Sequence, residues 1–401
     1  MSEKIWNRNF VSIFFAYFGI IISYMTLLPT FPIYVRDLGF TQDIVGFLTG
    51  VFTVTAILSR PVLGRKLDTS DRKMIYVAGA FISFIAIGSY YFIENMYLLM
   101  VMRLIHGIGI GITTSAANTI ATDFIPKHRM GEGVGYFSFC TVIGMAMAPA
   151  LGIYLVEHFG FAAVFFTSAS AALMGVALGL LLRYSPEQKD AFRQMAAANL
   201  ANKMTWSNMF ERNALRPAIT VLFAGASYNA VSSFLALYAE SKGVANIGLY
   251  FTVYACALVF SRTFGGKVAD RRGASIVIVP GLFVSALSVF LLYLANTLAQ
   301  FLMIAVVFGL GFGLAQTALQ TMAVTSVPAS RRGAAVSTHF TGLDLSILLG
   351  SSMAGMFSRH FGYETMMLLL TFPMLFSLFM FFALGKWIRP RTASAGPAKT
   401  E

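Results

Sequence analysis

Charged residues are scarce in this 401-residue chain, in which Asp, Glu, Lys and Arg together make up only 11%. Apolar side chains make up 57%, and the mean hydropathy is +0.73. A soluble domain of this length cannot hide that much apolar surface from water, so lipid must be the main solvent of the folded chain. The composition therefore excludes a water-soluble globular protein.

Cysteine is nearly absent, and Cys140 and Cys256 each lie inside an apolar run. Two such residues form no disulfide framework and give no information on the redox compartment. The chain starts MSEKIW and lacks the small-residue cleavage site of a secretory signal. We therefore expect the first apolar run to remain in place as a membrane helix.

Motifs for nucleotide, metal and covalent chemistry are missing as well. Gly107, Gly109 and Gly111 alternate inside an apolar run without a preceding strand or a following Lys-Ser/Thr pair, so they favour close helix packing over phosphate binding. No Cys/His cluster has metal-ligand spacing, and no nucleophile elbow is present. We expect no enzyme activity, no cofactor and no metal. We also expect any movement of solutes across the membrane to be driven by an ion gradient instead of by ATP.

Apolar runs long enough to cross ~30 Å of hydrocarbon as helices need about 20 residues each. Twelve are present, at 9–35, 43–65, 73–93, 96–123, 131–156, 161–183, 214–239, 244–266, 274–294, 298–325, 333–357 and 362–386. Prolines interrupt the first, at Pro29 and Pro32, and polar residues around Asn229 are expected to interrupt the seventh. The prediction is an all-α polytopic membrane protein.

Basic residues decide the orientation. Lys and Arg number 29 against 17 acidic residues, for a net charge of +12, but they lie in short turns and not on one face, which argues against nucleic-acid binding. With the N-terminus inside, the outer loops contain only Arg36, Lys242 and Arg359. This asymmetry predicts that both termini are cytoplasmic and that the protein lies in the cytoplasmic (plasma, in bacteria the inner) membrane.

An internal repeat runs through the chain. The basic turn SRPVLGRKLDTSDRK at 59–73 recurs 202 positions later as SRTFGGKVADRRG at 261–273. Further matches join Gly107, Gly109 and Gly111 to Gly309, Gly311 and Gly313, His158-Phe159-Gly160 to His360-Phe361-Gly362, and Tyr34 and Gly39 to Tyr238 and Gly243. An even number of spans between copies makes the repeats parallel. We predict two pseudo-symmetric six-helix bundles, at 1–183 and 214–390, an amphipathic cytoplasmic linker at 184–213 and a cytoplasmic tail at 391–401.

At these motifs the chain resembles the major facilitator superfamily, and within it the twelve-helix drug-proton antiporter group. The signature Gly-x₃-Asp-Arg-x-Gly-Arg-Arg/Lys is matched from Gly64 to Lys73, with departures at Thr69 and Asp71. Arg103, followed by a glycine run, resembles the fourth-helix signature. The fifth-helix signature, which is associated with exporters, is matched by Gly135, Gly144, Pro149 and Gly152, with Ala148 as the one departure.

The resemblance implies a paired cytoplasmic gate. Asp68 would contact the start of the span near Gly333, and Asp270 would contact the start of the span near Gly131, because carboxylates favour the positive ends of helices. The predicted gate residues are Asp68, Arg72, Asp123, Arg129, Asp270 and Arg271. The alternative is that these are ordinary charges at the membrane surface.

Ionisable residues that lack a counterpart in the other repeat are the candidates for coupling. Arg103, His106 and Asp344 match Ala305, Phe308 and Val142, and His339 likewise has no ionisable counterpart. Asp344, about 12 residues into its span, is the leading proton carrier. The alternatives are a structural hydrogen bond for Asp344, a packed role for His106 and extension of Arg103 to the membrane surface.

A mostly apolar substrate cavity is predicted, lined by Tyr24, Tyr34, Asn118, Tyr228, Asn229, Gln316 and Gln320. The predicted function is proton-coupled antiport, by alternating access of a monomer: efflux of small amphipathic, drug-like (multidrug) compounds. The alternatives are a sugar or metabolite exporter, a lipid flippase on the same fold, and a membrane sensor. A sensor needs a folded soluble module, and 184–213 and 391–401 are too short for one.

Overall fold

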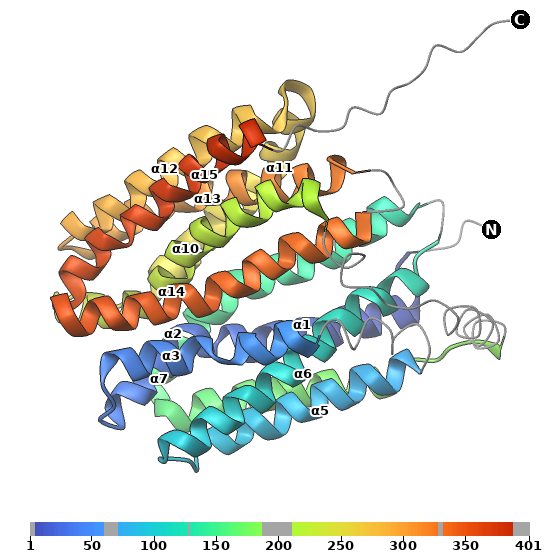
Figure 1. Ribbon diagram of the computed structural model, residues 1–401. Helices are drawn as coiled ribbons and strands as arrows, with labels where there is room; N and C mark the ends of the chain where they lie inside the picture. Colours follow the sequence, from blue (N-terminus) through green and yellow to red (C-terminus); the bar gives the residue numbers. More distant parts are fainter. Residues whose placement is uncertain (1–4, 60–70, 127–128, 187–210, 328–331, 388–401) are drawn as a thin grey trace, which may run out of the picture.

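The computed structural model describes residues 5–59, 71–126, 129–186, 211–327 and 332–387. In these ranges every regular element is helical (Figure 1). The elements are α1 (Arg8–Met25), α2 (Leu27–Asp37), α3 (Gln42–Gly50), α5 (Arg72–Tyr90), α6 (Met96–Asp123), α7 (Met130–Leu180), η2 (Arg212–Ala214), α10 (Leu215–Ser241), α11 (Gly248–Arg272), α12 (Ala274–Leu294), α13 (Leu298–Thr325), α14 (Arg332–Leu369) and α15 (Thr371–Trp387).

The all-α prediction is confirmed for this part of the chain, where nine helical stretches are long and apolar enough to cross a membrane. The segments Gly248–Ser261 and Thr371–Gly385 are shorter apolar helices. The number of twelve spans stays a prediction. The predicted linker lies outside the described residues from 187 to 210, as does the whole of the predicted tail.

Polar caps set several helix ends where the sequence places them. The side chain of Asn95 accepts from the N–H groups of Tyr97 and Leu98 at the start of α6. Thr297 and Gln300 form a capping box at the start of α13. These side chains pair backbone N–H groups that have no partner inside the helix. The bounds of α6, α12 and α13 coincide with the predicted spans.

Two long elements are each broken at a glycine. α7 contains Gly160 at φ 76°, and α14 contains Gly362 at φ 78°. A left-handed backbone favours glycine, so each residue ends one helical segment and starts the next. The two glycines are counterparts in the sequence repeat. Gly39 and Gly243, another matched pair, also have positive φ, of 86° and 71°.

Breaks in the first and seventh predicted spans differ from expectation. The first span divides at Thr26, between α1 and α2, three residues before Pro29. Pro29 explains this position, because proline has no N–H to bond the carbonyl one turn earlier, next to Thr26. The predicted interruption around Asn229 is wrong: α10 is continuous. Asn229 instead donates along the helix to the Gly225 carbonyl.

The internal repeat extends to atomic contacts. Tyr34 donates its hydroxyl to the carbonyl of Tyr90, at 2.9 Å, and its counterpart Tyr238 donates to the carbonyl of Leu292, at 3.0 Å. A Cβ on Gly107 would overlap the carbonyl oxygen of Phe52, and a Cβ on Gly309 would overlap that of Tyr254. Equivalent helices therefore approach one another through equivalent residues.

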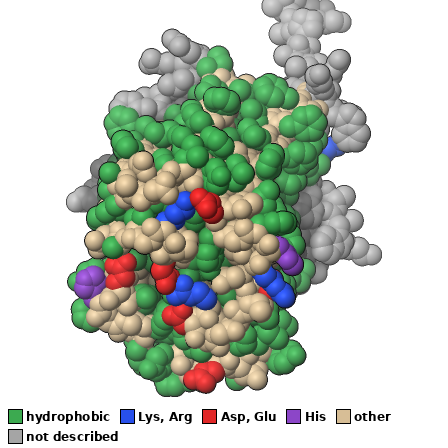
Figure 2. Space-filling view, turned by 90° about the vertical axis from the view of Figure 1, so that its left-hand side faces the viewer, with side chains coloured by type: hydrophobic (Ala, Val, Ile, Leu, Met, Phe, Trp, Pro, Cys, Tyr) green, Lys and Arg blue, Asp and Glu red, His purple; other side chains and the backbone are tan. Residues whose placement is uncertain are grey.

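Helices α1 to α7 form one group, of which α1, α3, α5 and α6 lie in the lower part of Figure 1. Helices α10 to α15 form the other group and lie in the upper part. The two groups meet where α3 packs on α14 and where α7 packs on α11. Charged side chains gather on the end of the molecule that faces away from both termini (Figure 2). We call this end, which contains residues 36–43, 240–247 and 359–364, the far end.

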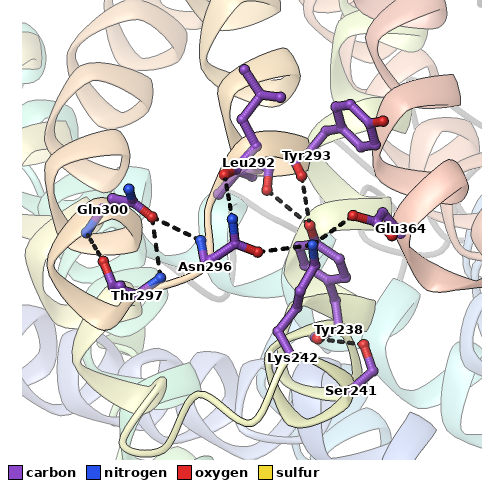
Figure 3. Close-up of polar contacts among 10 residues, drawn as sticks. Tyr238, Ser241, Lys242, Leu292, Tyr293, Asn296, Thr297, Gln300 and Glu364 are labelled. Carbon is purple, nitrogen blue, oxygen red and sulfur yellow. Dashed lines mark hydrogen bonds and ion pairs between the residues drawn. The ribbon is translucent and has the colours of Figure 1, made fainter.

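Ion pairs join the two groups of helices at the far end. Arg36 of α2 lies 2.5 Å from Glu240 of α10, and Arg359 of α14 lies 2.6 Å from Asp43 of α3. Within the group α10 to α15, Lys242 binds both Asn296 and Glu364, at 3.0 and 2.6 Å (Figure 3). The far end is thus closed by charge pairs as well as by helix packing.

A methyl group at Gly107 tests the close packing of α6. We expect Gly107→Ala to lower the melting temperature, because forcing a methyl against a carbonyl costs about 1–3 kcal/mol. The measurement is thermal unfolding of purified protein in detergent. Gly88→Ala is the matched control, since its Cβ would meet only Ala169 Cβ, at 3.9 Å. Equal melting temperatures for the two variants would contradict the packing account.

Candidate functional site

A small cavity lies between the two groups of helices. Its volume is about 20 Å³, enough for roughly one water molecule. It is lined by Tyr24, Met25, Leu27, Leu28, Phe52, Arg103, His106, Asn229 and Ile347. The lining brings Arg103 and His106 of α6 to the same place as Asn229 of α10 and Ile347 of α14. Four of the residues singled out in the sequence therefore meet here: Tyr24, Arg103, His106 and Asn229.

Arg103 is buried, with 3% of its surface exposed. Its Nε donates to the carbonyl of Leu48, at 2.9 Å, and its Nη2 donates to the carbonyl of Thr49. The guanidinium carbon lies 4.2 Å from the ring centre of Phe31 and 4.7 Å from that of Phe52. Aromatic faces and carbonyl oxygens both stabilise a cation. Extension of this side chain to the membrane surface is therefore ruled out by its position.

His106, one turn along α6, is fully buried. Its Nδ1 lies 3.0 Å from the Tyr90 hydroxyl, and its ring stacks on Phe52 at 5.8 Å. Its Nε2 makes no hydrogen bond to any atom that the structure describes. This imidazole, which lines the cavity, is thus held at Nδ1, and its second ring nitrogen is able to bind a proton or a ligand.

Asn229 is fixed on the opposite side of the cavity. Its amide nitrogen donates to the Gly225 carbonyl and to the Ser346 hydroxyl, both at 2.9 Å. Ser346 donates in turn to the Leu343 carbonyl, at 2.6 Å. Because Gly225 has no side chain, Ser346 of α14 is able to approach α10 closely. The amide group of Asn229 is therefore oriented by a chain of bonds that joins these two helices.

Asp344 is half-buried on α14. Ile347, Leu348 and Ser351 follow it at spacings of three, four and seven residues, so all four share one helix face. Ile347 lines the cavity, and Leu348 and Ser351 pack against Gly50. Asp344 therefore lies on the α14 face that is turned toward the N-terminal helices, one turn from the cavity.

His339 lies on a different face of α14 from Asp344. It shares the face of Gly342 and Ser346, which pack on Ala218 and Asn229 of α10. Its side chain is 1% exposed, and neither ring nitrogen has a hydrogen-bond partner among the described atoms. His339 and Asp344 are therefore not brought together, although five positions separate them in the chain.

Other residues predicted for the cavity lie elsewhere. Tyr34 packs on Phe165 with its hydroxyl bonded to backbone carbonyls. Tyr228 stacks on Phe312, with ring centres 4.7 Å apart. Asn118 is exposed and donates to the carbonyl of Thr114, Gln316 is half-buried, and Gln320 is exposed. None of these five residues lines the small cavity.

In the second repeat, aromatic rings occupy positions that match the surroundings of Arg103 and His106. The positions that match Phe52 and His106 hold Tyr254 and Phe308, and Tyr254 also stacks on Tyr228. The two halves therefore present different chemistry on the same framework. Sequence reasoning missed Tyr90, the partner of His106, because it compared only ionisable residues between the repeats. The mismatch of Tyr90 with Leu292 is the signal that would have found it.

The predicted gate is described only in part. Asp68 lies outside the described residues, as do the side chains of Asp270 and Arg271; Arg129 is half-buried just before α7. Arg72 pairs with Asp123, at 2.6 Å, and both are largely buried. Tyr184 donates to the same carboxylate, at 2.9 Å. Burial, together with the charge of Asp123, raises the pKa of Tyr184, so this phenol keeps its proton and remains a donor.

The fifth-helix signature packs α7 on the first span. A Cβ on Gly144 would overlap Ile21, and a Cβ on Gly152 would lie 2.6 Å from the Thr26 carbonyl oxygen. Pro149 lies inside α7, and Gly135 lies near its start. These small residues let α7 approach α1 and α2 closely, which is a packing role.

A groove of about 830 Å³ runs between α7 and α11. Its lining is apolar apart from one hydroxyl and one thiol: Phe139, Ile143, Met147, Ala150, Leu151, Thr252, Ala255, Cys256, Val259 and Phe260. The two helices approach closely at Gly248, where an added Cβ would lie 3.2 Å from Ile153 Cγ2. Cys256 is exposed in the groove, whereas Cys140 is buried.

Comparison with known proteins identifies the family. The model of the Major Facilitator Superfamily matches residues 13–246 and 243–401. The chain therefore belongs to this superfamily, as its motifs predict, and it is a multi-pass membrane protein that acts as a secondary transporter of small molecules.

Several relatives are named for multidrug resistance or efflux. The chain is 25% identical over 401 residues to the multi-drug resistance efflux pump PmrA of Streptococcus pneumoniae, covering 96% of this chain and 99% of the relative. It is 25% identical over 405 residues to the multidrug resistance protein MdtG of Enterobacter lignolyticus, covering 98% and 95%. An uncharacterised transporter of the same superfamily from Methanocaldococcus jannaschii is 22% identical, over 90% and 94%.

Solved structures share the fold. A bacterial homologue of the lysosomal transporter Spinster superposes with a TM-score of 0.80 at 15% identity, covering 94% of this chain and 96% of that one. The nucleoside transporter NupG superposes with a TM-score of 0.78 at 15% identity, covering 94% and 100%. At these identities the likeness establishes the architecture and says nothing of the substrate.

The buried Arg72–Asp123 pair gives a stability test. Asp123→Leu leaves the buried Arg72 charge without this carboxylate, and breaking such a pair typically costs about 3–5 kcal/mol. We expect this variant to melt well below the parent protein. The double variant Arg72→Leu/Asp123→Leu should recover much of the loss, because an apolar pair of similar size is tolerated. Thermal melts that show additive losses would contradict a coupled pair.

Proposed function

We propose that the protein exports small amphipathic compounds from the cytoplasm in exchange for protons, by alternating access of the cavity at Arg103 and His106. The observation that carries the proposal is the makeup of this cavity: ionisable residues of α6 meet an oriented amide on α10 and an apolar residue on α14. The names of two relatives support the substrate class, since PmrA is a multidrug resistance efflux pump and MdtG is a multidrug resistance protein. The name of PmrA also supports the direction of transport.

The proposal includes twelve spans in two six-helix bundles, with both termini cytoplasmic, in a monomer in the cytoplasmic membrane. Two spans each would be provided by α7, which reverses at Gly160, and by α14 with α15, which reverse at Gly362. The repeated contacts of Tyr34 and Tyr238 support two equivalent bundles. In this arrangement the far end is extracellular, and its ion pairs close the outer side of the cavity.

Proton coupling is assigned to Asp344, with His106 as the second candidate. An ionised carboxylate in a membrane needs water or a cation, whereas its protonated form tolerates apolar surroundings. The protonation state of Asp344 would then follow the side to which the cavity is open. Its position on the α14 face next to Ile347 supports direct coupling between the proton and the cavity.

A lipid flippase is the second candidate, and the groove between α7 and α11 favours it. An apolar groove at the side of a membrane protein is able to hold hydrocarbon chains that enter from the bilayer. Sugar or metabolite export has less support, because Asn229 is the one member of its predicted polar set that lines the small cavity.

Neutralising Asp344 tests the coupling. In proteoliposomes with an imposed pH gradient, we expect Asp344→Asn to abolish uphill export of an amphipathic dye, because an amide does not take up the coupling proton. Downhill movement of the dye should persist. His339→Gln is the matched control on the same helix and should retain coupling. Gradient-driven export by Asp344→Asn would exclude Asp344 as the proton carrier.

Filling the groove separates the two candidate functions. Cys256→Trp places a large ring among the groove residues, whereas Leu249→Trp changes an exposed apolar residue of α11 that does not line the groove. If the protein is a flippase, Cys256→Trp should reduce transfer of a fluorescent phospholipid at least about tenfold, because the blocked groove excludes its chains. The flippase is rejected if the parent protein transfers no lipid and Cys256→Trp exports a water-soluble dye as fast as the parent does.

A further inference from the structure

The second membrane span is broken close to the cavity. α3 ends at Gly50, and the helix resumes at Phe52. Val51, between them, keeps helical dihedral angles (φ −60°, ψ −26°), so the break lies in the backbone hydrogen-bond pattern. Three successive carbonyls at the break accept hydrogen bonds from side chains. Leu48 and Thr49 accept from the Arg103 guanidinium, and Gly50 accepts from the Thr53 hydroxyl, at 2.8 Å. Carbonyls at a helix break inside a membrane require such donors, since lipid supplies none.

The second repeat provides an internal comparison. The helix that matches the second span is α11, and it runs without interruption through the equivalent positions, Tyr250 to Thr252. The position that matches Arg103 is Ala305. The buried cation and the broken helix therefore occur in the same half, and both are missing from the equivalent place in the other half.

The segment beyond the break, α3, closes the far end. A Cβ on Gly46 would overlap the Ser351 carbonyl oxygen, and one on Gly355 would overlap the Gln42 carbonyl oxygen. Asp43, in the first turn of α3, pairs with Arg359 of α14. The backbones of α3 and α14 are thus in direct contact, and the angle at Val51 decides whether α3 fits against its neighbour.

We propose that Arg103 is a positioning residue that fixes the break at Val51 and so seats α3 against α14. Its planar fork holds two carbonyls at once, and the ring faces of Phe31 and Phe52 keep it in place. Arg103 also lines the cavity. A hydrogen-bond acceptor that enters the cavity competes with Leu48 and Thr49 for the same donors, and this competition loosens α3 at the far end.

This role would make the centre and the far end of the protein communicate through one side chain. It holds whichever compound or ion is transported, and it concerns only the closure of the far end. Its test therefore uses neither substrate nor gradient, and its outcome is independent of the transport assays above.

The experiment measures the labelling rate of a reporter cysteine under α3. Ser351 is fully buried and faces Gly46 and Gly50, so Ser351→Cys in a Cys140→Ala/Cys256→Ala background reports separation of α3 from α14. In detergent, with a water-soluble maleimide, we expect Arg103→Met to raise the labelling rate roughly tenfold or more. Arg103→Lys should give an intermediate rate, because an ammonium lacks the planar fork.

Two controls distinguish positioning from general loosening. Tyr24→Phe changes a residue of α1 that lines the same cavity, and it should leave the rate unchanged. Ser227 of α10 is fully buried and donates its hydroxyl to the Leu370 carbonyl, away from α3. A cysteine at this position therefore reports opening elsewhere in the protein. Equal acceleration at Ser227→Cys and Ser351→Cys would mean that Arg103 only stabilises the whole fold.

A milder variant covers the case in which Arg103→Met does not fold. Thr53→Val removes only the donor to Gly50 and should accelerate labelling of Ser351→Cys by a smaller factor. Combined with Arg103→Lys, it should act less than additively in log rate, because both changes relax the same break. An unchanged rate at Ser351→Cys in Arg103→Lys and in Thr53→Val would overturn the proposal.

Discussion

Hydrocarbon offers no hydrogen bonds, and this constraint shapes the interior of the protein. Every bend in a membrane helix exposes carbonyls that another part of the chain must pair. At Val51 the Arg103 guanidinium provides two of the donors, and Thr53 provides a third. The cation in turn needs the carbonyls and the ring of Phe31, since an unpaired charge costs several kcal/mol in such surroundings. Break and charge stabilise each other.

The two repeats share the same helix packing but differ in the side chains near the centre of the protein. Glycines hold equivalent helices close together in both halves, at Gly107 and Gly309. The side chains around the centre have diverged: His106 and its partner Tyr90 on one side correspond to Phe308 and Leu292 on the other. Packing depends on backbone approach and tolerates this exchange, so the interior chemistry is able to change while the helix arrangement stays the same.

Much of the fold could be predicted because its signals are local. Run length and capping residues place α6, α12 and α13, and glycine marks the turns at Gly160 and Gly362. The break at Val51 has only a weak signal, since no proline lies near it and Gly50, directly before it, is one of many glycines inside the predicted spans. Its cause is a side chain on another helix. The same holds for Tyr34, whose placement depends on which carbonyls α5 leaves available.

The far end shows how a duplicated sequence comes to close on itself. Arg36 and Glu240 occupy equivalent positions in the two repeats, as the matched Tyr34 and Tyr238 beside them show. In a parallel repeat, equivalent positions near the pseudo-symmetry axis face each other. Identical charges there would repel, whereas the diverged pair attracts at 2.5 Å. Because this pair is partly exposed, solvent weakens it, so the two residues separate at little cost in free energy, as the proposed alternating access requires.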